Sequence, residues 1–407
     1  MKDLQFWNFP LSLIAAAVFI SCIILFRKFL HGSRLHSVLT GGKMSVCLLI
    51  AAAALCAVEG TWRLILFRHW AFLAFTAFLM FCLGLDVIED IAGKRPLSRT
   101  LSHCGLFLIL FGGFFGAPDF SDVQMAVSRE QAGHIAFSAD GTPTALPFDV
   151  RLADFIVDYY EDGVSPKQFT SVLDIGGRQV TTSVNHPCRH KGYRIYQAGY
   201  DQLGNSYSII KFVRDPWIPL VYAGMALLAL ASLIGLGRTW KSKAVLPAIL
   251  SLAAVFCVVS LLKINFSTLM PALRSLWFIP HIIIYMIAYS VLAIALVLSG
   301  ISLTGKAGCA VAADRLLRTA SSLLITGMIC GAVWAKAAWG DYWTWDGKEC
   351  WAAATWLLTL AGTHFPRRTP KATFIFILLA FLAMQLTWYG VNYLPSAQFS
   401  LHSYTQG

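Results

Sequence analysis

Residues 278–303 read FIPHIIIYMIAYSVLAIALVLSGISL, a stretch that contains no Asp, Glu, Lys or Arg. A helix of about 20 apolar residues crosses the hydrocarbon core of a bilayer, which is about 30 Å thick. This stretch is therefore predicted to form a transmembrane helix, and it sets the fold class. His281 stands close to its beginning, so an ionisable side chain is expected near one end of that helix.

The composition of the whole chain agrees with this interpretation. Of its 407 residues, 57% are hydrophobic and only 13% are charged, whereas an ordinary soluble domain is about 25% charged. Mean hydropathy is +0.64. These values exclude a soluble globular protein. Apolar runs of similar length predict about ten transmembrane helices, at residues 9–26, 44–62, 70–88, 101–117, 217–236, 245–262, 278–303, 319–335, 351–364 and 373–391.

A polar stretch, residues 118–216, separates the fourth predicted helix from the fifth. β-branched and aromatic residues alternate in it, for example in TSVLDIGGRQVTTSV (170–184) and SYSIIKFV (206–213). The chain is therefore predicted to be a polytopic α-helical membrane protein with a small β-rich domain outside the membrane. We expect four parts, comprising four helices in 1–117, the β-rich domain in 118–216, a fifth helix with a linker in 217–244, and five helices in 245–407.

The net charge of +11 reflects the side of the membrane on which basic residues gather. Cytoplasmic loops of membrane proteins carry an excess of Lys and Arg. One set of predicted loops holds 16 of the 32 Lys and Arg residues, the other set with both termini holds seven, and residues 118–216 hold the other nine. We therefore expect both termini and the 118–216 domain outside the cytoplasm. Membrane lipid is an expected partner, and nucleic acid is not.

Six of the 13 tryptophans lie between residues 333 and 356, in VWAKAAWGDYWTWDGKECWAAATW. An aromatic belt at the membrane interface is the simpler interpretation, but a belt needs only one or two rings per helix end. The density of rings instead predicts a broad aromatic surface at the outer ends of the helices. Such a surface suits a flat, apolar and partly anionic ligand. A porphyrin has these properties.

Four of the ten histidines are predicted at helix ends, and the topology sorts them into two pairs. His281 and His402 are expected on the outer side, near the Trp-rich segment. His103 and His364 are expected at cytoplasmic helix ends. Two imidazoles complete the six-coordination of a haem iron, and ionisable groups in membrane helices are functional candidates because they are costly there. Two pairs at two depths predict two sites for one cofactor.

The other histidines and the cysteines have simpler interpretations. His31 and His36 lie in a basic cytoplasmic loop and are expected to be solvated. His134, His186 and His190 are expected at the surface of the β-rich domain. The chain contains neither CxxC nor CxxCH. We therefore expect neither a thiol–disulfide exchanger nor a c-type cytochrome.

These segments resemble one family of haem-handling proteins. WGDYWTWDGKECWAAATW (339–356) is similar to the tryptophan-rich WWD signature. PHIIIYMIAYSVL and VNYLPSAQFSLHSY resemble the histidine segments of the CcsA (ResC) type of cytochrome c synthase, while PFDVRLADFIVDYY, NHPCRHKGYRIYQAGYD and SHCGLFLILFGG resemble its partner CcsB (ResB). The chain thus resembles a fused CcsB–CcsA synthase of system II, CcsB-like to about residue 236 and CcsA-like from about residue 245. Gly347 stands where the family usually has Pro.

This resemblance implies a function and a role for each matched residue. It implies a holocytochrome c synthase, a haem lyase that carries haem b outward and attaches it to the CxxCH cysteines of apocytochrome c. A thiol-reducing, thioredoxin-like partner and a location in the inner membrane of a bacterium are implied too. His281 and His402 would be axial iron ligands at the outer site, and His103 and His364 would be those within the membrane. The porphyrin would be held and positioned by Trp339, Tyr342, Trp343, Trp345, Asp346 and Trp351.

Two other functions stay open at this point. A haem exporter or chaperone would deliver haem outward without forming thioether bonds, although the CcsB-like outer domain favours the synthase. A quinone or ion transporter fits less well, because intramembrane carboxylates are few and Glu59 and Asp86 lie at helix ends.

Overall fold

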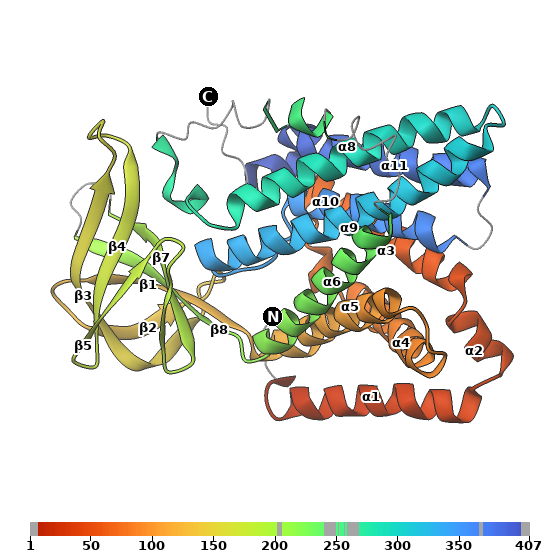
Figure 1. Ribbon diagram of the computed structural model, residues 1–407. Coiled ribbons are helices and arrows are strands. Elements are labelled where there is room, and N and C mark those ends of the chain that lie inside the picture. The colour runs from red at the N-terminus through yellow and green to blue at the C-terminus, as the bar shows by residue number, and fades with distance from the viewer. Residues whose placement is uncertain are drawn as a thin grey trace.

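The structure is a computed structural model that describes residues 7–201, 206–239, 250, 252–255, 257–258, 268–365 and 369–399. It consists of a helical bundle with a β-domain at one end (Figure 1). Within the described residues, eight helices are long and apolar enough to cross a membrane. The chain is therefore a polytopic membrane protein with a β-rich domain, as the sequence predicted.

Five helices precede the β-domain. They are α1 (Leu11–Leu30), α2 (Arg34–Leu39), α3 (Gly42–Trp62), α4 (Trp70–Ala92) and α5 (Leu97–Gly116). The short helix α2 lies in a stretch that was expected to be a loop, and the Ser33 side chain caps it by accepting a hydrogen bond from the His36 backbone. Ile23, Cys82 and Leu85 are buried where α1 packs against α4.

The β-domain is one antiparallel sheet of eight strands, in the order β5-β4-β3-β2-β1-β8-β7-β6. The sheet curls on itself and brings β5 next to β7, although they are far apart in the strand order. The Thr182 hydroxyl of β5 donates a hydrogen bond to the Ile195 carbonyl oxygen of β7 at 2.7 Å. Val150, Leu173 and Ile210 are fully buried between the facing strands. The strands are β1 (Ser121–Ser128), β2 (Gly133–Phe137), β3 (Pro143–Tyr159), β4 (Pro166–Ile175), β5 (Arg178–Ser183), β6 (Cys188–His190), β7 (Tyr193–Tyr200) and β8 (Tyr207–Arg214).

The second half of the bundle contains α6 (Ile218–Thr239), α8 (Phe278–Ser302), α9 (Ala307–Ala338), α10 (Gly347–His364) and α11 (Pro370–Trp388). Tyr289, Leu317 and Ile377 are buried in a core that α8, α9, α10 and α11 share. Short 3₁₀ helices cover Leu66–Arg68, Ala117–Asp119, Pro271–Leu273, Gly390–Tyr393 and Pro395–Phe399.

Two predicted helices need comment. The prediction of a helix at 319–335 was too short, because α9 already begins at Ala307. Its first turns are rich in Ala and contain an Asp314–Arg318 ion pair, so they are helical through good helix formers rather than through an apolar run. The predicted helix at 245–262 lies largely outside the described residues.

Helices α5 and α6 form the hairpin from which the β-domain projects, and two glycines let them approach closely. A Cβ atom at Gly105 would lie 2.7 Å from the Gly224 carbonyl oxygen, and one at Gly224 would lie 2.6 Å from the Gly105 carbonyl oxygen. At the end next to the β-domain, the Asp119 carboxylate accepts hydrogen bonds from the Ser12 hydroxyl and the Trp217 indole, both at 2.7 Å. The glycine contact thus holds α5 against α6 within the bundle, and the Asp119 hydrogen bonds hold the two helices together next to the β-domain.

We predict that Gly105→Ala lowers the free energy of unfolding by about 1–3 kcal/mol, because the added methyl group overpacks a backbone contact. Thermal denaturation of the purified protein in detergent measures this. Gly113→Ala, in the same helix, is the matched control, since a Cβ atom there meets nothing within 4 Å. Equal melting temperatures for the two variants would contradict the close contact.

Candidate functional site

His103 and His364 lie side by side, although 260 residues separate them in the chain. His103 is in the second turn of α5, and His364 is the last residue of α10. Their ring centroids are 6.1 Å apart and the ring planes differ by 28°. The side chain of His103 is only 12% exposed. The structure thus brings together the two histidines that the sequence placed at one level.

Both rings are held through their Nδ1 atoms. His103 Nδ1 lies 2.7 Å from the Asp90 carboxylate, whose side chain is 1% exposed and also pairs with Arg99 at 3.0 Å. His364 Nδ1 lies 2.9 Å from the Leu360 carbonyl oxygen. A histidine that binds a metal usually has its other ring nitrogen held in this way, by a carboxylate or a backbone carbonyl. Both imidazoles thus make the Nδ1 contacts that are typical of metal-binding histidines.

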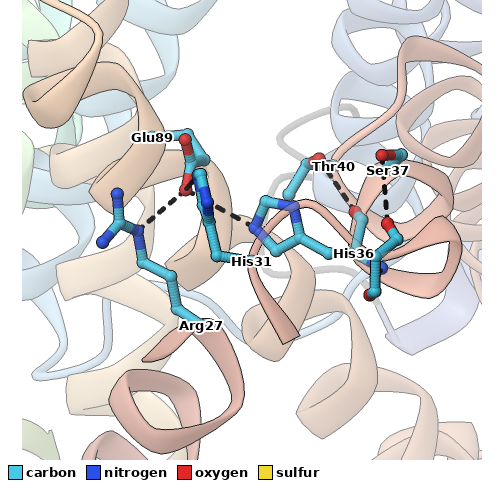
Figure 2. A network of polar contacts seen from close by, with 7 residues as sticks. Arg27, His31, His36, Ser37, Thr40 and Glu89 are labelled. Carbon is cyan, nitrogen blue, oxygen red and sulfur yellow. Dashed lines mark hydrogen bonds and ion pairs between the residues drawn. The ribbon is translucent and has the colours of Figure 1, made fainter. Parts of the chain in front are cut away.

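A second cluster of basic side chains gathers around Glu89, next to Asp90 on α4 (Figure 2). The Oε1 atom of Glu89 lies 2.8 Å from Arg27, 3.8 Å from His31 and 3.4 Å from His36. The prediction that His36 is solvated was wrong, because its side chain is only 7% exposed. Helix α2 causes this difference by turning His36 toward α4.

His281 lies in the first turn of α8, and its Nδ1 is 2.8 Å from the Gly327 carbonyl oxygen of α9. Its ring contacts those of Tyr285 and Trp334, at centroid distances of 4.9 and 6.0 Å. His281 opens onto a largely apolar cavity of about 300 Å³, which we call the aromatic cavity. Its lining includes Tyr285, Met328, Trp334, Tyr342, Trp343 and Trp388.

The rings of the Trp-rich segment are divided between the aromatic cavity and its surroundings, and Trp343 contacts Trp345 with ring centroids 6.2 Å apart. Tyr342 and Trp343 line the aromatic cavity. Trp339 packs against Trp334, with ring centroids 5.2 Å apart. Trp345 has a φ of +59° and stacks on Phe67 at 5.5 Å.

Much of this segment is helical, and residues 339–346 connect α9 to α10. Trp351 lies within α10, where a Cβ atom on Gly60 of α3 would come within 2.9 Å of its ring. The helices thus direct the rings toward different neighbours.

Asp346 caps helix α10. Its carboxylate accepts a hydrogen bond from the Glu349 backbone N–H at 2.8 Å, and the Glu349 carboxylate accepts one from the Asp346 N–H. Asp346 is 3% exposed. The contacts of this side chain therefore serve the start of α10.

Gly347, where the resembled family usually has Pro, is the first residue of α10. A Cβ atom there would lie 2.7 Å from the Ser396 hydroxyl, so this position has no room for a larger residue. His402, the predicted partner of His281, lies outside the described residues.

Lys211 of β8 joins the β-domain to the Trp-rich segment. Its ammonium group lies 2.8 Å from Asp122 of β1 and 2.7 Å from Asp341, and Lys211 is only 8% exposed. Burial lowers the pKa of Lys211, but the carboxylates of Asp341 and Asp122 outweigh that effect and raise it above its ordinary value. The ion pairs therefore hold the connection between α9 and α10 against the β-domain.

Helix α10 separates the two histidine regions. It begins at the Trp-rich segment and ends at His364 after 18 residues, which corresponds to a length of about 27 Å. His281 lies at the end of α8 that meets this segment through Trp334. The two candidate regions are therefore at opposite ends of the bundle, about one hydrocarbon core apart.

Comparison with known proteins finds relatives for most of the chain. Residues 95–216 match the ResB-like family, and residues 217–397 match the Cytochrome C assembly protein family. The two matches meet between β8 and α6. Helix α6 therefore falls in the second match, whereas the sequence analysis placed the change between about residues 236 and 245.

Individual relatives carry the name cytochrome c biogenesis protein CcsA. The one from Chlamydomonas reinhardtii is 34% identical over 156 residues, which cover 34% of this chain and 43% of the relative. The one from Pyropia yezoensis is 46% identical over 86 residues, which cover 20% of this chain and 26% of the relative. The one from Guillardia theta is 28% identical over 261 residues, which cover 52% of this chain and 79% of the relative. The chain thus spans less than half the length of the first two.

We predict that Lys211→Met lowers the free energy of unfolding by about 3–5 kcal/mol, because it leaves two carboxylates without their cation. It should also speed backbone hydrogen exchange in residues 339–346, which measures the link between domain and loop. Lys167→Met, an exposed lysine of β4, is the control and should leave both unchanged. Exchange at the wild-type rate in Lys211→Met would show that the ion pairs do not hold this segment.

Proposed function

We propose that this chain, which belongs to the fused CcsB–CcsA (ResB–ResC) proteins of cytochrome c biogenesis, carries haem b across the membrane and attaches it to apocytochrome c. Haem would bind first between His103 and His364 and then at the aromatic cavity beside His281. There it would be joined to the CxxCH cysteines of the apocytochrome. In this proposal haem is the substrate rather than a resident cofactor.

The facing pair of His103 and His364 carries the proposal. Their rings lie 6.1 Å apart within the bundle, and a carboxylate and a backbone carbonyl hold the Nδ1 atoms. Imidazole pairs bind haem iron from its two faces, and membrane proteins rarely place ionisable groups in their helices without a functional reason. The family of the chain supports haem as the metal complex that this pair binds.

The composition of the aromatic cavity supports the second proposed haem site. It combines an imidazole with the rings of Trp334, Tyr342 and Trp343, so it offers a metal ligand beside surfaces on which a porphyrin can stack. We propose that His281 is one axial ligand there and His402 the other. Trp339, Trp345, Asp346 and Trp351 would act by fixing the shape of the segment that carries Tyr342 and Trp343.

The proposed reaction adds each cysteine S–H across a vinyl double bond of haem. The sulfur forms a thioether with one vinyl carbon, the proton and electron pair form a C–H bond at the other, and nothing leaves. The protein has to bring two thiols and two vinyl groups together in one orientation, so its contribution is positioning. Neither a hydrolytic nucleophile nor a bound phosphate is required.

The topology and partners follow from this proposal. In a bacterial inner membrane, the histidine pair would face the cytoplasmic half and the aromatic cavity would face outward, beside the β-domain. Apocytochrome c would be bound on that outer side. A thioredoxin-like partner would keep its cysteines reduced, because the chain has no CxxC motif of its own.

We predict that His103→Ala and His364→Ala each abolish maturation of a reporter cytochrome c and leave the outer site without haem, because haem fails to enter. The measurements are the absorption spectrum of the purified protein and haem that stays attached to the reporter after denaturation. His281→Ala should also abolish maturation but retain haem at the inner pair.

His134→Ala is the matched control, since this histidine lies on the exposed face of the β-domain beside Asp149. It should mature the reporter as the wild type does. Full haem loading of the outer site in His103→Ala would refute the proposal that haem first binds between His103 and His364. If the chain, expressed without other assembly factors, supplies haem that denaturation then removes from the reporter, the function is delivery rather than attachment.

We predict that Asp90→Asn weakens haem binding at the inner pair about 10–100-fold and raises the midpoint potential of that haem. The variant keeps the size of the side chain but gives His103 a poorer hydrogen-bond partner. A haem titration with redox potentiometry, in a His281→Ala background, isolates the inner site.

Glu89→Gln is the matched control for this measurement. It removes the neighbouring carboxylate of the same helix, which pairs with Arg27 and not with His103. An unchanged affinity and potential in Asp90→Asn would show that Asp90 only stabilises the fold.

A further inference from the structure

A second cavity, of about 310 Å³, lies where the β-domain meets the outer ends of α6 and α9. We call it the basic cavity. Arg189, Lys191 and Arg194 line it from the β6–β7 hairpin, and Lys336 lines it from α9. The carboxylate of Asp215 is the acidic group in this lining. Four basic side chains thus face one carboxylate.

The nearby carboxylates are already engaged elsewhere. Asp215 accepts hydrogen bonds from the backbone N–H groups of Trp217 and Ile218 at the start of α6, and it lies 3.9 Å from Lys336. Asp122 and Asp341 share Lys211. Among the described residues, no carboxylate lies within 4 Å of the charged groups of the three hairpin cations. Lys191 donates a hydrogen bond to the Pro147 carbonyl oxygen at 3.3 Å, and Arg194 donates one to the Tyr222 hydroxyl at 3.2 Å. These partners are neutral, so they do not balance the positive charge of the hairpin.

The basic cavity and the aromatic cavity share a wall. The Lys336 ammonium group lies 4.5 Å from the centre of the Tyr342 ring, and Tyr342 also lines the aromatic cavity. Ala335 lines the aromatic cavity from the position before Lys336. A ligand with an apolar body in one cavity and an acidic end in the other would be in contact with both sets of residues.

We propose that the basic cavity binds the oxyanion end of an amphiphile. Arginine donates paired hydrogen bonds to carboxylate or phosphate, and lysine adds a point charge. The shared wall favours the carboxylates of a haem whose ring lies in the aromatic cavity, and this form rests on the proposed function. The phosphate of a membrane lipid has the same chemistry, because the cavity lies at the level where α6 leaves the membrane.

The test compares the wild-type chain with the double variant Arg189→Gln/Lys191→Gln. Both side chains are exposed, so the variant should fold. Each protein is titrated with haem and with haem dimethyl ester, which keeps the iron and vinyl groups but lacks the free carboxylates. Each is also melted in nanodiscs of phosphatidylcholine with and without phosphatidylglycerol. Arg178→Gln, an exposed arginine of β5, is the matched control.

If haem carboxylates bind here, the wild type and Arg178→Gln should prefer haem over the ester by about tenfold or more, and the double variant should lose that preference. If the phosphate of a net-anionic lipid binds here, phosphatidylglycerol should raise the melting temperature of the wild type but not of the double variant, because phosphatidylcholine balances its phosphate with its own cation. Identical behaviour of wild type and double variant in both measurements would overturn the proposal.

Failure of the proposed function would look different. In that case the wild type would give no bis-imidazole spectrum with either porphyrin, since both carry the iron that the histidines bind. The lipid measurement would then still test the basic cavity.

Discussion

The arrangement at the end of the bundle away from the β-domain depends on one buried carboxylate, Asp90. The Asp90 side chain is almost completely enclosed, pairs with Arg99 and lies 2.7 Å from His103 Nδ1. An unpaired carboxylate would be very costly at this depth, so α4 and α5 have to meet in the one register that brings these three side chains together. That register turns His103 toward the end of α10, where His364 lies. The ion pair thus determines both helix packing and the geometry of the histidine pair.

The end of the bundle that carries the β-domain is organised by contacts between distant parts of the chain. The β-domain is inserted between α5 and α6. These two helices pack closely where Gly105 meets Gly224. Lys211 then fastens the domain to the connection between α9 and α10. As a result, the ResB-like and cytochrome c assembly parts build the outer region jointly. The aromatic cavity belongs to the second part, and the basic cavity draws residues from both.

Hydropathy predicted the spanning helices because a bilayer demands length and apolarity. It missed α2 and the start of α9, which are helical for local reasons. The sequence placed His103 and His364 at one level, but only tertiary packing shows that they touch. It gave no sign that Asp90 holds His103, since that contact joins two helices. It also misjudged His36, because the direction of that ring depends on where α2 begins.

Helix α10 is capped at one end by Asp346 and Glu349 and carries His364 at the other. This helix packs against α3, α9 and α11, so its 18 residues set the separation between the Trp-rich segment and His364. If haem moves between the two histidine sites as proposed, it would have to exchange ligands along this helix, because the two sites lie at opposite ends of it.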